Sequence, residues 1–163
     1  MRLTDEVLRK MVQFYRGDPR RIQHFIKVHS FAAYIGRQEG LDAGTQEILE
    51  IAALVHDIGI KSAEKKYGSA PGKLQELEGP PEARRLLEGT GMDPQAVDRV
   101  CFLVSRHHTC SDVDGPDHRI LLEADFLVNC YEDQFSPEAA RSVLQSVFRT
   151  RTGIGLLTEM LGL

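Results

Sequence analysis

Apolar residues recur along the chain with the spacing of α-helices. Within residues 18–38, His24, Val28, Phe31 and Ile35 are separated by four, three and four positions, which places them on one helix face. No long run of alternating β-branched residues, the pattern of a β-strand, is present. The sequence therefore predicts an all-α fold, in which helices bury their apolar faces against one another as a bundle.

Capping residues set the predicted ends of the helices. Asp, Ser and Thr cap helix N-termini, and Pro fits the first turn, so Thr4-Asp5, Asp18-Pro19, Asp93-Pro94 and Ser136-Pro137 each indicate a helix start. The predicted helices cover about residues 4–15, 18–38, 43–56, 80–88, 93–108 and 120–132, with further helical segments around 143–148 and 156–161.

Two polar segments separate these helices. Residues 60–79 contain Pro71-Gly72 and are predicted to form a long loop with one helical turn, after which Pro80-Pro81 opens a short helix. Residues 112–117 form a second turn-rich segment. Loops of the length of 60–79 usually have a function.

Composition and charge narrow the classes of protein to which this chain can belong. The 163 residues suit one domain, residues 1–163, and 42% hydrophobic with 27% charged residues is an ordinary soluble mixture. A net charge of −4 gives no reason to expect binding to nucleic acid or to an anionic membrane. The start, MRLTDEVLRK, is amphipathic, unlike a secretory signal, and no apolar stretch could cross a bilayer. We therefore expect a cytoplasmic protein.

Three cysteines are present, and they show no metal-binding spacing. Cys101, Cys110 and Cys130 form no CxxC pair. In a reducing cytoplasm we expect free thiols that serve as small core residues.

The most informative motif is His56-Asp57-Ile58-Gly59, at the end of an apolar run. It offers an imidazole nitrogen and a carboxylate oxygen side by side. Adjacent helical residues diverge, so both can bind one ion only where the helix ends, and Gly59 is expected to end it in the left-handed conformation. The alternative is a capped helix end with one buried histidine.

Further polar residues interrupt the apolar faces of other predicted helices. His24 lies on the inward stripe of residues 18–38, His107-His108 end another helix, and Asp125 stands among leucines and valines. A buried carboxylate without a partner is costly, and a shared cation would compensate both Asp57 and Asp125. Helical bundles build metal sites from such inward His and Asp residues.

At these positions the chain resembles the HD-domain superfamily of metal-dependent phosphohydrolases. The matching motifs appear in the family's order: His24-Phe25-Ile26-Lys27-Val28, Leu54-Val55-His56-Asp57-Ile58-Gly59, Gly79-Pro80-Pro81-Glu82-Ala83, Ser105-Arg106-His107-His108 and Leu121-Leu122-Glu123-Ala124-Asp125-Phe126-Leu127. The resemblance implies an HD-domain helical bundle whose motif-bearing core covers about residues 21–132, followed by a C-terminal helical extension.

The resemblance also implies a metal centre. Carried over from the family, one divalent ion (Mn, Fe, Co, Ni, Zn or Mg) is bound by His24, His56, Asp57 and Asp125.

Some members of the family bind a second metal through further histidines, which His107 and His108 match. Dinuclear members often have another metal-binding histidine where this chain has Gly79, so a second site would need Glu78 or Glu82 instead.

The implied activity is hydrolysis of a nucleotide or another small phosphate ester through a metal-bound hydroxide. The expected catalytic residues are Asp57, Lys61, His107 and His108: the lysine would stabilise phosphoryl charge, and one histidine would position water or protonate the leaving group.

Arg149 and Arg151 are further candidates for contacts to the substrate phosphate, with a solvated helix face as the alternative. We expect no role for His29, a half-buried residue of the helix that carries His24, and a surface position at the start of a helix for His118.

Two other functions remain open at the level of sequence. One is an HD-type di-iron oxygenase, which would need a complete second ligand set. The other is a sensor without enzymatic activity that binds a metal or a nucleotide. Neither nucleic acid nor a membrane is an expected partner, and the sequence leaves the oligomeric state and the identity of the metal open.

Overall fold

The computed structural model describes residues 2–163, and this part of the chain is helical and contains no β-strand. The all-α prediction is thereby confirmed, with an architecture consistent with an HD-domain bundle. The helices are α1 (Leu3–Phe14), α2 (Pro19–Gln38), α3 (Ala43–Val55), α4 (Ile60–Tyr67), α5 (Gly72–Leu87), α6 (Pro94–Val104), α7 (Gly115–Glu132), α8 (Pro137–Ser146) and α9 (Arg151–Leu161). No helix in the described range is long and apolar enough to cross a membrane.

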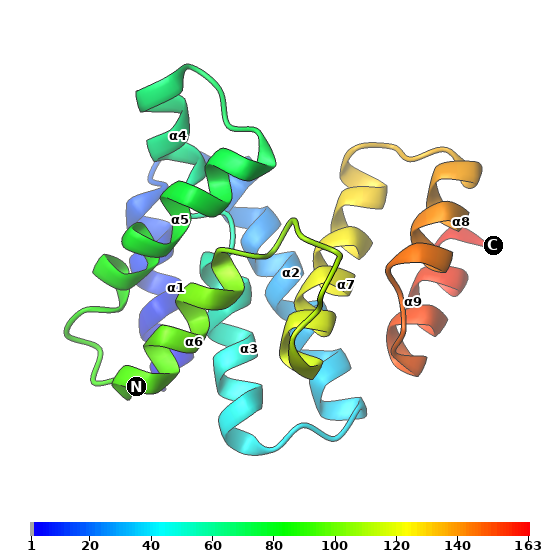
Figure 1. Ribbon diagram of the computed structural model, residues 1–163, viewed down its shortest axis with the longest axis horizontal. Helices are drawn as coiled ribbons and strands as arrows, with labels where there is room; N and C mark the ends of the chain where they lie inside the picture. The colour runs from blue at the N-terminus through cyan, green and yellow to red at the C-terminus, as the bar shows by residue number, and fades with distance from the viewer. Residues whose placement is uncertain (1) are drawn as a thin grey trace.

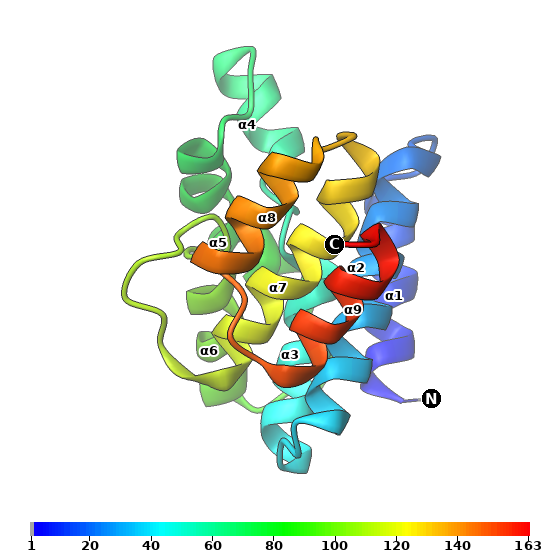
Figure 2. The ribbon, with the colours of Figure 1, turned by 90° about the vertical axis from the view of Figure 1, so that its right-hand side faces the viewer.

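Helices α2, α3 and α7 form the centre of the molecule (Figure 1). Helices α1 and α6 pack against α3, and α5 lies against α6 and α4. Helices α8 and α9 lie on the side opposite α5 and α6, at the right of Figure 1 and facing the viewer in Figure 2, and α9 contacts α7 and α2. This arrangement encloses α3 and brings its C-terminal end between α2, α6 and α7.

Local sequence explains most helix boundaries. The side chains of Asp18, Asp42, Asp93 and Ser136 each accept a hydrogen bond from a backbone N–H in the first turn of the helix that follows. The first helix differs, because Arg2 stands at its N-cap and makes no capping bond, so Thr4-Asp5 lies inside the helix. The core is built from the inward stripe of α2 and from residues 51–55 of α3, which are all buried.

The long loop predicted over residues 60–79 is wrong. This segment forms α4 and the first half of α5, and Pro80 and Pro81 lie inside α5 instead of opening a helix. An internal proline removes a backbone hydrogen bond and usually ends a helix. Here α5 continues to Leu87, packed against α4 and α6, so tertiary contacts override the local preference.

Gly59 has a different role from the one expected. Its φ angle is −75°, so it does not adopt the left-handed conformation. A Cβ atom at this position would lie 2.5 Å from the backbone nitrogen of Gly79 and 2.7 Å from the carbonyl oxygen of Gln75. Glycine is therefore required because α5 crosses the His56-Asp57 turn in direct backbone contact.

Two further expectations need correction. His118 is fully buried in α7, where its Nε2 contacts the carbonyl oxygen of Arg106 at 3.0 Å and its Nδ1 accepts from the backbone of Asp114. The helix begins at Gly115, five residues before the predicted start, and His118 in its first turns contacts the 106–114 segment. Of the free cysteines, Cys101 and Cys130 are buried as expected, whereas Cys110 is exposed.

Candidate metal centre

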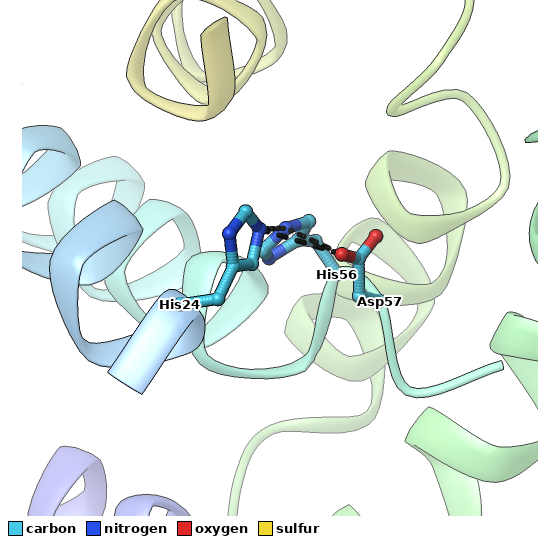
Figure 3. A group of neighbouring side chains, drawn as sticks. All are labelled: His24, His56 and Asp57. Carbon is cyan, nitrogen blue, oxygen red and sulfur yellow. Dashed lines mark hydrogen bonds and ion pairs between the residues drawn. The ribbon is translucent and has the colours of Figure 1, made fainter. Parts of the chain in front are cut away.

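Four polar side chains converge where α3 ends. His24 comes from the first half of α2, His56 and Asp57 follow the last turn of α3, and Asp125 comes from the middle of α7. Figure 3 shows the His24 ring pointing at His56 and Asp57. The hydroxyl of Tyr15 donates to the carbonyl oxygen of Asp57 at 3.1 Å and thus holds the backbone of this turn.

The distances between these donor atoms suit a single cation. The Nε2 atoms of His24 and His56 are 3.2 Å apart, and each lies 3.2–3.5 Å from Asp57 Oδ2 and Asp125 Oδ1. Ligands at about 2.1 Å from an ion are separated by about 3.0 Å in octahedral and about 3.4 Å in tetrahedral coordination. The spacing therefore lets His24, His56 and Asp57 share one divalent ion, and Asp125 Oδ1 faces the same two imidazole nitrogens.

The histidines are oriented by hydrogen bonds from their other ring nitrogens. His56 Nδ1 lies 2.8 Å from the carbonyl oxygen of Ala53, and His24 Nδ1 lies 3.0 Å from Glu132 Oε2. Because these partners accept only, each Nδ1 carries the proton and each Nε2 presents a lone pair to the centre. This is the tautomer that a metal ligand needs.

Glu132 was not identified from the sequence. It is the last residue of α7, and its second carboxylate oxygen is 2.5 Å from Lys27 Nζ. Its position seven residues after Asp125 places both on one helix face, a spacing that could have revealed it. Glu132 orients His24 and adds negative charge beside the centre.

Asp125 has a buried carboxylate oxygen without a hydrogen-bond partner. Its side chain is 6% exposed, and its Oδ1 atom, which faces both histidines, has no hydrogen-bond partner. An ionised carboxylate in such a place requires compensation. Since Oδ1 is the oxygen that faces the two Nε2 atoms, a cation among them would provide it.

The charges of the cluster perturb each other's protonation. Burial disfavours the charged form of His24, but the proximity of Asp125, whose Oδ1 lies 3.2 Å from His24 Nε2, and the charges of Asp57 and Glu132 outweigh it and raise the His24 pKa to about 9. Burial also opposes ionisation of Asp57 and Asp125, yet the neighbouring histidines hold the pKa of both carboxyls well below its usual range. In the absence of a metal, protons on the histidines therefore balance the carboxylates.

Asp57 faces a second group of donors with its other oxygen. His107 Nε2 lies 2.9 Å from Asp57 Oδ1, and His108 Nε2 lies 3.9 Å from it. His107 Nδ1 is 2.7 Å from the carbonyl oxygen of Val104, so its Nε2 is also directed inward. The residues Asp57, His107 and His108 thus form a second cluster that could hold an ion.

The glutamates expected to complete this second cluster are engaged elsewhere. Glu78 accepts from Lys66 at 2.6 Å and from the Tyr67 hydroxyl at 2.9 Å, and the bond from Lys66 lowers its pKa. Glu82 accepts from the Ser62 hydroxyl at 2.8 Å. The structure therefore does not bring Glu78 or Glu82 to His107 and His108.

The expected phosphate-binding residues also lie apart from the donors. Lys61 donates to the carbonyl oxygen of Phe14 at 3.0 Å. The Arg149 guanidinium donates to carbonyl oxygens at the end of α8, including that of Gln145, and Arg151 lines a cavity of about 570 Å³ between α2 and α9. None of the four converging residues lines that cavity. His29 is half-buried beside Glu50, 3.3 Å away, and takes no part in the centre.

A separate recess of about 420 Å³ opens directly at His24 and Asp57. Its lining includes Arg20 and Arg21 from the first turn of α2, Asn129 from the last turn of α7, and Asp133 directly after that helix. Arg21 is fixed by Glu64 at 2.6 Å. The centre is therefore accessible to a small molecule, with cationic and hydrogen-bonding groups beside it.

The family model described as HD domain matches residues 21–139, which includes both donor clusters. No curated protein and no solved structure matches the chain.

Proposed function

Because the chain belongs to the HD domain family, we propose that it is a metal-dependent phosphohydrolase that acts on a small phosphate ester, including nucleotides. The observation that supports this most is the unpartnered Oδ1 of Asp125, which faces two imidazole lone pairs. The ligands we propose are His24, His56, Asp57 and Asp125. Two imidazoles and two carboxylates suit Mn, Fe, Co, Ni or Zn, and Mg is less favoured because it prefers oxygen ligands.

When bound, a divalent ion would supply Lewis-acid polarisation of a phosphoryl oxygen. The protein's own groups account for the rest of the proposed chemistry. As long as no second ion is bound, His107, held 2.9 Å from Asp57, is placed to hold or deliver a proton to the leaving group. Arg20 borders the recess, next to the Arg21–Glu64 pair, and can bind phosphate oxygens, a role for which the sequence suggested Lys61, Arg149 and Arg151.

The test is metal reconstitution joined to a substrate panel. The protein is stripped with a chelator, reloaded with one ion at a time, and assayed with nucleoside monophosphates and other phosphate esters. We expect no hydrolysis after stripping and recovery with at least one ion. Asp125→Asn should lose both metal and activity, whereas Asp5→Asn, the same change at an exposed position of α1, should retain both.

Undiminished hydrolysis after stripping would contradict the proposal. Binding of a nucleotide without turnover in any metal form would favour a sensor. The two faces of Asp57 also suit a di-iron oxygenase, so dioxygen consumption by the iron-loaded protein, with no phosphate release, would favour that reaction instead.

A further inference from the structure

We propose that Gln75 supplies the oxygen ligand that completes a second divalent-cation site with Asp57, His107 and His108. This inference rests on the proposed function, because it concerns the same centre. This chain has Gly79 where a histidine ligand would stand, and we infer that the amide of Gln75, one helical turn earlier, serves in its place.

The donor atoms of Asp57, His107 and His108 lie together, and the oxygen of Gln75 adjoins them at His108. Gln75 Oε1 is 2.7 Å from His108 Nε2, and His107 Nε2 is 2.9 Å from Asp57 Oδ1. The His107 and His108 rings face each other with centroids 3.9 Å apart. Two imidazoles, one carboxylate and one amide carbonyl form a mixed nitrogen and oxygen set suited to Mn²⁺ or Fe²⁺.

The amide of Gln75 is fixed with its oxygen toward the site. Its Nε2 donates to the carbonyl oxygen of Ala70 at 2.6 Å. A carbonyl oxygen can only accept, so this bond settles which end of the amide points to His108. An oxygen held in this way is preorganised as a ligand.

Packing explains why no side chain at position 79 can act as a ligand. A Cβ atom on Gly79 would lie 2.5 Å from Val104 Cγ1, and Gly79 itself supports the close approach to Gly59. Gln75 precedes Gly79 by four residues, so both lie on the same face of α5. The side chain of Gln75 can therefore contact His108, whereas a side chain at position 79 would have no room.

The neighbouring carboxylate has another task. Glu76 Oε1 accepts from the backbone nitrogen of His108 at 3.0 Å and from the Thr109 hydroxyl at 2.8 Å. Glu76 therefore holds the turn that carries the two histidines, and Gln75 is the α5 residue whose amide oxygen faces His108.

The rival explanation is that Gln75 only accepts a hydrogen bond from His108 and thereby positions it. The two explanations differ in the sign of one substitution. If Gln75 is a ligand, Gln75→Glu adds a charged oxygen donor and strengthens binding of the second ion. If Gln75 only accepts a hydrogen bond from His108, the new carboxylate forms an ion pair with that ring, competes with the ion for it and weakens binding.

The experiment is titration of the metal-stripped protein with Mn²⁺, followed by calorimetry and by electron paramagnetic resonance, in which two neighbouring ions give an exchange-coupled signal. We expect two ions in wild type, the second bound more weakly. Gln75→Leu should weaken the second ion by more than about tenfold, since even the loss of an outer-shell partner costs about 10–100-fold. Gln75→Glu should strengthen it. Gln95→Glu, the same change at an exposed position of α6, should match wild type.

Three results would overturn the inference: a wild type that binds one ion at every Mn²⁺ concentration, a Gln75→Leu variant that binds two ions as wild type does, or weaker binding in Gln75→Glu. Should Gln75→Leu fail to fold, the Gln75→Glu titration still decides the question. If the protein hydrolyses a phosphate ester but the variants bind the second ion as wild type does, only the role of Gln75 is refuted. If the variants shift the affinity as expected but the protein hydrolyses no phosphate ester, only the proposed function is refuted.

Discussion

Glu132 offers a sharp test of how the centre is organised, because it contacts His24 and is not itself a proposed ligand. Glu132→Ala removes the carboxylate that lies 3.0 Å from His24 Nδ1. The described residues provide no other acceptor for this nitrogen, so the ring loses the bond that fixes its tautomer and orientation. The variant also loses a negative charge next to the bound cation.

The expected magnitude follows from these two losses. Removing an outer-shell partner lowers metal affinity about 10–100-fold, which corresponds to about 1.4–2.7 kcal/mol of binding free energy. We expect Glu132→Ala to lie near the upper end, because orientation and charge are both lost. Glu132→Gln retains an oxygen acceptor and should lie near the lower end.

The assay is calorimetric titration of the stripped proteins with Mn²⁺, with circular dichroism to verify helix content. Lys27→Met removes the other partner of Glu132, at 2.5 Å, and should leave affinity equal or higher, because one cation is lost near the site. Glu138→Ala, at the exposed start of α8, is the control and should match wild type. Wild-type affinity in Glu132→Ala would show that the bond to His24 does not organise the centre.

Four further outcomes follow. Asp57→Ala should abolish metal binding while circular dichroism shows unchanged helicity, because a ligand is lost and the core is not; retained metal would refute its role. Glu123→Ala should lower the free energy of unfolding by roughly 2–4 kcal/mol in denaturant titrations, since the backbone nitrogens of Arg149 and Thr150, at 2.6 and 3.0 Å, lose their acceptor, with metal affinity unchanged. Gly59→Ala should cost at least about 1–3 kcal/mol in the same assay, because its Cβ would meet the backbone of Gly79; wild-type stability would contradict that contact. In the metal-free protein, the pKa of His24 is raised from 6.5 to about 9, so its contribution to stability is complete below pH 6.5 and is lost as pH rises through about 9. Thermal unfolding across this range should show the decrease in stability, and saturating metal should abolish that pH dependence.

The sequence predicts the central helices well and singles out the polar residues that converge at the end of α3, for a physical reason. In α2 and α3 the apolar stripe, the aspartate caps and the following glycine or turn all favour the same structure. Polar residues on such stripes, such as His24 and Asp125, stand out because burial would be costly without a partner. The structure brings these two residues together with His56 and Asp57.

Other features depend on contacts that the local pattern does not contain. Pro80-Pro81 indicates a helix start, yet packing against α4 and α6 carries α5 through it. The role of Gly59 depends on the crossing of α5, and that of His118 on the 106–114 segment above it. Gln75 and Glu132 become recognisable only when their helices are placed beside the histidines that they contact.

The most direct test of the central claim is anomalous diffraction from crystals of the protein grown with Mn²⁺, recorded at the manganese edge. The account predicts a peak within about 2.0–2.3 Å of His24 Nε2, His56 Nε2, Asp57 Oδ2 and Asp125 Oδ1. A metal-saturated crystal with no peak among these four atoms, or with its peak at another place in the molecule, would contradict it.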